Sequence, residues 1–144
     1  MKNVIAIALA VLVGFAVVSY FRGSAAQAPT PAVFAKGTTL SKAIDESRKS
    51  GKPVYAVVTA SWCSWCQKLK GEALADPTVA AWIEANTIPV MIDADAQRDD
   101  AIKLGANGLP ASFILKDGKV VASHEGYMPT KDYLAFLKSG VPEG

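Results

Sequence analysis

Cysteine and histidine are scarce in this chain of 144 residues, which holds two cysteines and one histidine. Structural zinc sites usually take four Cys or His ligands, so these three residues argue against one. The single histidine, His124, lies far along the chain from both cysteines, and we expect it to be an ordinary strand residue. Covalent haem attachment requires a histidine directly after a Cys-x-x-Cys pair, where this chain has Gln67. No metal or cofactor is therefore expected, although two thiolates can bind copper(I) and a copper carrier stays open as an alternative.

Acidic residues are absent from residues 1–37, which carry Lys2, Arg22 and Lys36. Removing these three from the 15 basic residues leaves 12 against 13 acidic ones, so residues 38–144 have a formal charge of −1. Such a surface has no basic field to attract a polyanion, and no nucleic-acid partner is expected.

Apolar side chains are concentrated at the N-terminus, where Val4–Phe21 is an uncharged run of 18 residues between Lys2 and Arg22. As a helix this run would be about 27 Å long, close to the ~30 Å hydrocarbon core of a bilayer. We expect residues 1–22 to be a signal anchor in the inner membrane, a single span with the following domain facing the periplasm. Ala26-Gln27-Ala28 has the small residues of a cleavage site, so a cleaved signal and a soluble periplasmic domain are the alternative. A buried core helix is the third interpretation.

Residues 23–37 are small and polar, with Pro29 and Pro31, and predict a linker. The alternative is that part of this segment, such as Val33-Phe34, packs on the domain. The domain itself is expected to occupy residues 38–144.

Helix and strand patterns alternate through residues 38–144, and together they predict an α/β fold. The strand–helix–strand order of the first half requires a crossover and parallel pairing, whereas Asp117-Gly118 predicts an antiparallel hairpin. A mixed four-stranded sheet with helices on both faces follows. The expected strands are Val54–Thr59, Ile88–Asp93, Ala111–Leu115 and Val120–His124. The expected helices run from Leu40 to before Gly51, from the cysteine pair to Lys70 or Gly71, from Pro77 past Ile83, from Asp95 or Ala96 to Leu104, and from Lys131 to Lys138, closed by Gly140.

Both cysteines lie in one pentapeptide, Trp62-Cys63-Ser64-Trp65-Cys66, between a buried strand and a helix. The N–H groups and partial positive charge of a helix N-terminus lower the pKa of a thiol there. We therefore expect Cys63 to be the attacking thiol, and Cys66 to resolve the mixed disulfide that forms. A structural disulfide this short would close only a tiny loop and add little stability, which favours redox chemistry.

This motif and three others, taken in order, resemble the thioredoxin superfamily over roughly residues 38–139. The others are Gly51-Lys52-Pro53 before the first strand, Asp76-Pro77 at a helix start, and Gly108-Leu109-Pro110 before a later strand. The chain is most similar to membrane-tethered or exported members, such as the C-terminal domain of the thiol:disulfide interchange reductase. It departs from the family at Ala111, where threonine is common, and at Val57, where many members have a buried acid.

The resemblance implies further site residues. Pro110 would have a cis peptide bond and lie beside the cysteines, and the backbone of Leu109 would pair with an incoming client chain. Trp62 would belong to the apolar rim that clients touch. Trp65 is unusually large for a position inside the motif; we expect it to shield the disulfide from small thiols or to widen the docking surface, with packing on a neighbouring loop as the alternative.

The expected function is that of a protein thiol:disulfide oxidoreductase which reduces client proteins through Cys63 and Cys66 without a bound cofactor. Its partners would be protein thiols and disulfides, together with a membrane protein that donates electrons from a dithiol. An oxidase or isomerase is the alternative within the same chemistry. Because Val57 replaces the buried acid, the proton of Cys66 would pass to water, to Glu72 or Asp93, or to the client thiolate.

Overall fold

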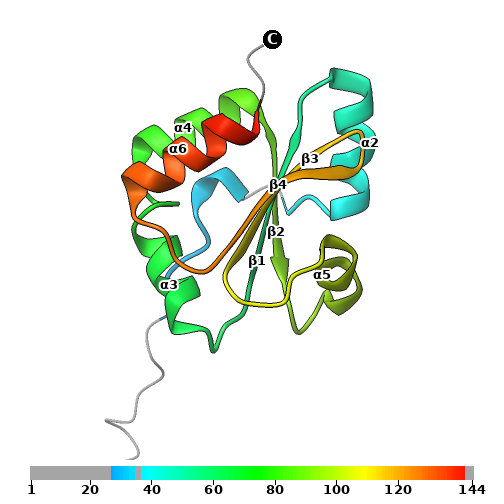
Figure 1. Ribbon diagram of the computed structural model, residues 1–144. Helices are drawn as coiled ribbons and strands as arrows, with labels where there is room; N and C mark the ends of the chain where they lie inside the picture. The colour runs from blue at the N-terminus through cyan, green and yellow to red at the C-terminus, as the bar shows by residue number, and fades with distance from the viewer. Residues whose placement is uncertain (1–26, 35–36, 142–144) are drawn as a thin grey trace, which may run out of the picture.

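The computed structural model describes residues 27–34 and 37–141, which contain one four-stranded sheet. Figure 1 shows this sheet between two layers of helices. The strands form one sheet in the order β2-β1-β3-β4, with β1 parallel to β2 and antiparallel to β3, and β3 antiparallel to β4. The predicted mixed sheet is therefore confirmed. The elements are η1 (Ala32–Phe34), α2 (Leu40–Ser50), β1 (Val54–Thr59), α3 (Ser64–Gly71), α4 (Pro77–Asn86), β2 (Ile88–Asp93), α5 (Arg98–Leu104), β3 (Ala111–Lys116), β4 (Lys119–Glu125) and α6 (Thr130–Gly140).

Strand β1 is buried along its whole length because helices cover both faces of the sheet. Alternate residues of a strand point to opposite faces. Val54, Ala56 and Val58 pack with residues of α2 and α5, whereas Tyr55 and Val57 pack with residues of α3, α4 and α6. Figure 1 shows these two groups of helices on opposite faces of the sheet. The cysteine pair follows directly after this central strand, so the packing on both faces of the sheet fixes its position.

Most helices begin or end at the capping residues that the sequence indicates. Asp76 Oδ1 accepts the N–H groups of Thr78 and Val79 at the start of α4, which satisfies two backbone donors that have no partner within the helix. Helix α5 begins at Arg98, later than expected, because Asp93 Oδ1 accepts the N–H groups of Asp95 and Ala96 and holds them in a turn.

Gly140 was expected to close the last helix, but it is the final buried residue within α6. A Cβ at this position would lie 2.9 Å from the Ala122 Cβ and closer still to the Ile114 Cδ1. Glycine is present here because α6 approaches the sheet closely.

Part of the segment expected to be a linker packs on the domain. Phe34 is 6% exposed, and its ring lies 5.9 Å from that of Tyr55 beneath the sheet. The alternative interpretation of Val33-Phe34 is therefore the one that the structure shows. Among residues 27–34 and 37–141 there is no helix long and apolar enough to cross a membrane, and Val4–Phe21 lies outside this range.

Candidate active site

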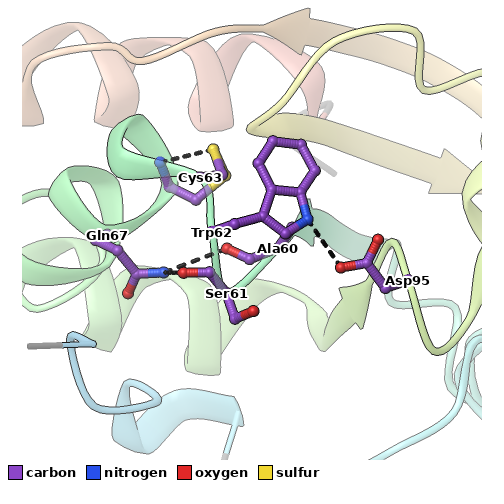
Figure 2. The surroundings of a disulfide bond; sticks show 7 residues. Ala60, Ser61, Trp62, Cys63, Gln67 and Asp95 are labelled. Carbon is purple, nitrogen blue, oxygen red and sulfur yellow. Dashed lines mark hydrogen bonds between the residues drawn. A yellow bond between two sulfur atoms is a disulfide. The ribbon is translucent and has the colours of Figure 1, made fainter. Parts of the chain in front are cut away.

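Cys63 and Cys66 are joined by a disulfide at the start of α3, with their Cα atoms 5.2 Å apart. Cys63 is the N-cap residue, and its Sγ accepts the N–H of Cys66 at 3.2 Å (Figure 2). Cys63 is 7% exposed and Cys66 is fully buried. Once the bond is reduced, that N–H and the helix terminus stabilise negative charge on Cys63, which is also the sulfur that a partner can reach.

Pro110 follows a cis peptide bond after Leu109, as predicted. Leu109 packs against Ala60, Cys63 and Cys66, so this loop lies directly on the disulfide. The buried Pro110 accepts the N–H of Gly126 through its carbonyl oxygen at 2.7 Å, which fixes the loop to the end of β4.

Trp62 is 70% exposed, although its indole N–H donates to Asp95 Oδ2 at 2.9 Å (Figure 2). This bond holds the ring beside a groove of about 610 Å³ next to Cys63. Arg98 is the charged residue of the groove, whose lining is otherwise mostly apolar. The lining residues are Val58, Trp62, Cys63, Ser64, Trp65, Ala94, Arg98, Ala101, Ile102, Ala106, Asn107, Gly108 and Leu109.

Trp65 is 55% exposed, lines the groove beside Cys63 and also packs on the loop before α6, so the packing expected as the alternative occurs together with its place in the groove. Its ring centroid lies 5.6 Å from that of Tyr127. The ammonium group of Lys68 lies 5.3 Å from the Trp65 ring and 4.6 Å from the Tyr127 ring. The Tyr127 hydroxyl donates to Glu72, and this hydrogen bond raises the pKa of Tyr127. Glu72 therefore already has a partner, and so has Asp93, which caps a turn.

His124 pairs with Ser112 across β3 and β4, and its ring lies 6.0 Å from that of Phe136. It is a packed strand residue, as expected. Val57 is fully buried where many members of the resembled family have an acid.

Gln67 is a contact residue that the sequence analysis did not identify. Its amide nitrogen donates to the carbonyl oxygens of Ala60 and Ser61, and its amide oxygen accepts the N–H of Ala28. The sequence signal was weak, since a glutamine after a Cys-x-x-Cys pair has no fixed partner until the fold is known.

A reachable sulfur at a helix N-terminus, bonded to a buried partner one turn later, can exchange two electrons with another dithiol by successive thiolate attacks. The fold and this site define a thiol:disulfide oxidoreductase. The chain matches the thioredoxin-like domain family over residues 40–140 and belongs to that family.

Individual relatives agree with this assignment. The chain is 30% identical over 88 residues to thioredoxin of Bacillus subtilis (strain 168), an alignment that covers 61% of this chain and 85% of that protein. The fold is similar to that of the DsbH oxidoreductase, with a TM-score of 0.63, 18% identity and coverage of 82% and 87% of the two chains. It is also similar to the C-terminal domain of DsbD from Neisseria meningitidis in the oxidised form, with a TM-score of 0.61, 19% identity and coverage of 69% and 90%.

Proposed function

We propose that this protein reduces disulfides of client proteins in the periplasm while Val4–Phe21 holds it to the outer face of the inner membrane. A dithiol protein in the membrane returns it to the reduced form. The length of the apolar run and the charges on either side of it support the anchor. The cytoplasm keeps thiols reduced by other means, so an exported dithiol needs an electron donor of its own.

The chemical step follows from the positions of the two sulfurs. The Cys63 thiolate attacks one sulfur of a client disulfide, and the other client sulfur leaves as a thiolate. Cys66 then attacks the Cys63 sulfur in the mixed disulfide, which releases the second client thiolate and closes the Cys63–Cys66 bond. Two electrons pass to the client. Because Val57 cannot accept the Cys66 proton, the proton passes to water or to the client thiolate that was released in the first step.

The observation that carries the reductive direction is the environment of Cys63. The two residues between the cysteines, Ser64 and Trp65, bring no positive charge. Lys68 follows Cys66 and is held over aromatic rings. Arg98 of α5 lines the same groove as Cys63 and adds a positive charge there. The N-terminus of α3 is the source of stabilisation that contacts the Cys63 sulfur directly, and a moderately acidic thiol favours a reductant over a strong oxidant.

The redox state of Cys63 and Cys66 in intact cells tests this proposal. Cells are quenched with acid, free thiols are alkylated, and the chain is separated by mass. We expect the reduced form to dominate and the disulfide to accumulate when membrane electron donors are removed. A chain that is oxidised in unperturbed cells would support the oxidase alternative. Copper(I) bound to the reduced chain in native mass spectrometry would support the carrier alternative.

Cell fractionation tests the anchor. We expect the intact chain in the membrane fraction, facing the periplasm and open to added protease. A soluble chain beginning near Pro29 would contradict the anchor and leave the redox chemistry untouched.

A further inference from the structure

The side chain of Gln67 connects three separate parts of the chain. Its Nε2 donates to the carbonyl oxygens of Ala60 and Ser61, both at 3.2 Å, in the loop that leads to Cys63 (Figure 2). Its Oε1 accepts the Ala28 N–H at 3.0 Å. These partners fix the orientation of the amide, because two are carbonyl oxygens that accept and one is an N–H that donates.

The two bonds from Nε2 restrain the cysteines relative to each other. Gln67 is next to Cys66 on α3, whereas Ala60 and Ser61 precede Cys63. The Ala60 carbonyl also accepts the N–H of Cys63 at 3.3 Å, which closes a turn. The amide therefore ties the loop that carries one sulfur to the helix that carries the other. Such a restraint raises the effective concentration of one thiol at the other and favours the disulfide.

The bond from Oε1 adds the N-terminal segment, residues 27–34, to this arrangement. The segment is held at one end by Phe34, which is buried next to Tyr55, and near its other end by Ala28 on Gln67. A shift of the Ala60–Ser61 loop between the two redox states would therefore move the Gln67 amide and change its hydrogen bond to Ala28.

We propose that Gln67 is a positioning residue that couples the docking of residues 27–34 to the redox state of the Cys63–Cys66 pair. The inference rests on the proposed function only in that the pair is redox-active. Coupling between two sites is reciprocal, so docking of the segment favours the disulfide by the same factor by which the disulfide favours docking.

The test is the equilibrium of the full chain, in detergent, with reduced and oxidised glutathione. Gln67→Ala removes all three bonds and should shift the equilibrium toward the dithiol by about threefold to tenfold, as ordinary hydrogen bonds allow. A tenfold shift equals about 30 mV. Ala28→Pro removes only the N–H that Oε1 accepts, and should shift it the same way by about twofold to threefold. Pro29 already favours an extended backbone at this position, which proline also adopts.

Gln27→Pro is the matched control, because it introduces a proline one residue earlier and keeps the Ala28 N–H. We expect the wild-type equilibrium for it. An unchanged equilibrium in Gln67→Ala or in Ala28→Pro would overturn the proposal, as would an equal shift in Gln27→Pro. Should Gln67→Ala fail to fold, Ala28→Pro still decides the coupling.

Hydrogen exchange supplies the reciprocal measurement. The Ala28 amide should exchange about twofold to threefold faster in the reduced chain than in the oxidised chain, and equal rates would overturn the coupling. Glutathione replaces the client in these experiments. A chain that gives the expected shifts but does not reduce client proteins would therefore refute the proposed function alone.

Discussion

Two regions of this protein reverse the usual placement of apolar and polar side chains. Around Cys63 the exposed rim, defined by Trp62 and Trp65, leaves large apolar rings 70% and 55% accessible to solvent. Beneath the sheet a hydroxyl cluster of Tyr55, Ser112 and Tyr133 is 0%, 2% and 0% exposed. The rim lines the groove beside Cys63, whereas the hydroxyl cluster lies in the core between the sheet and α6.

The two regions differ in whether their side chains are satisfied inside the protein: the buried hydroxyls have hydrogen-bond partners, whereas the exposed rings leave apolar area uncovered. Tyr133 lies between Tyr55 and Ser112, with its hydroxyl 2.6 Å from the Ser112 Oγ and hydrogen-bonded to the Tyr55 hydroxyl. No buried side-chain nitrogen or oxygen in residues 27–34 and 37–141 lacks a partner. The hydroxyl cluster is satisfied within the protein and is structural. The rim keeps apolar area exposed, which is typical of a surface that binds other proteins.

Removing a cysteine should have the largest effect, because it eliminates one step of the exchange. Cys66→Ala should accumulate mixed disulfides with client proteins, and Cys63→Ala should form none. Client reduction should fall about 10³-fold or more in both variants, as when a catalytic nucleophile is lost. Non-reducing gels of purified chain and client measure it. Trapping by Cys63→Ala in place of Cys66→Ala would reverse the assigned roles.

Tyr133→Phe should damage the hydroxyl cluster and leave the rim intact. It removes the central hydroxyl, so the buried hydroxyls of Tyr55 and Ser112 each lose a hydrogen-bond partner. We expect the free energy of unfolding to fall by about 1–3 kcal/mol. Urea unfolding measures this cost. Tyr127→Phe is the control, at a partly buried tyrosine outside the cluster. It removes the hydrogen bond to Glu72 and should cost less than Tyr133→Phe. Slower thiol–disulfide exchange with clients in a folded Tyr133→Phe chain would show that the hydroxyl cluster and the rim are not independent.

Trp62→Ala and Trp65→Ala should slow exchange with clients and leave stability nearly unchanged, which is the opposite of what we expect for Tyr133→Phe. Each should slow exchange with protein clients about tenfold, which corresponds to about 1.4 kcal/mol in the barrier. The free energy of unfolding should change by less than about 1 kcal/mol. Val121→Ala, at an exposed apolar residue of β4, controls for apolar area away from the disulfide. Equal effects of all three variants on exchange would contradict a role for the rim.

The hydroxyl cluster should also make stability depend on pH in alkaline solution. Burial raises the pKa of Tyr133 to about 12 and raises that of Tyr55 well above its ordinary value. Unfolded tyrosine ionises near pH 10, so this contribution is fully present below pH 10 and is lost as the pH rises toward 12. Tyr133→Phe should show a shallower decline of unfolding free energy between pH 10 and 11. Identical slopes would mean that Tyr133 does not titrate as its burial requires.

Sequence patterns predicted the strands, the position of the cysteines and the cis bond before Pro110, because each depends on local chemistry or on a family motif. They did not predict the hydroxyl cluster, in which Tyr55 and Tyr133 are far apart in sequence and meet only when α6 packs on the sheet. The burial of Phe34 was only the alternative interpretation of its segment, and the bonds of Gln67 were missed, for the same reason. The role of Gly140 was misassigned because close packing, and not a left-handed turn, requires that glycine.

The reduction potential of the Cys63–Cys66 pair tests the central claim of a reductase most directly. It is measured on the wild-type chain by equilibration with a series of glutathione mixtures at pH 7. Because the direct stabilisation of the Cys63 thiolate comes from the N-terminus of α3, we expect a potential near that of thioredoxin, about −270 mV. A potential near that of a strong periplasmic oxidant, about −120 mV, would contradict the reductive direction and make the protein an oxidase on the same fold.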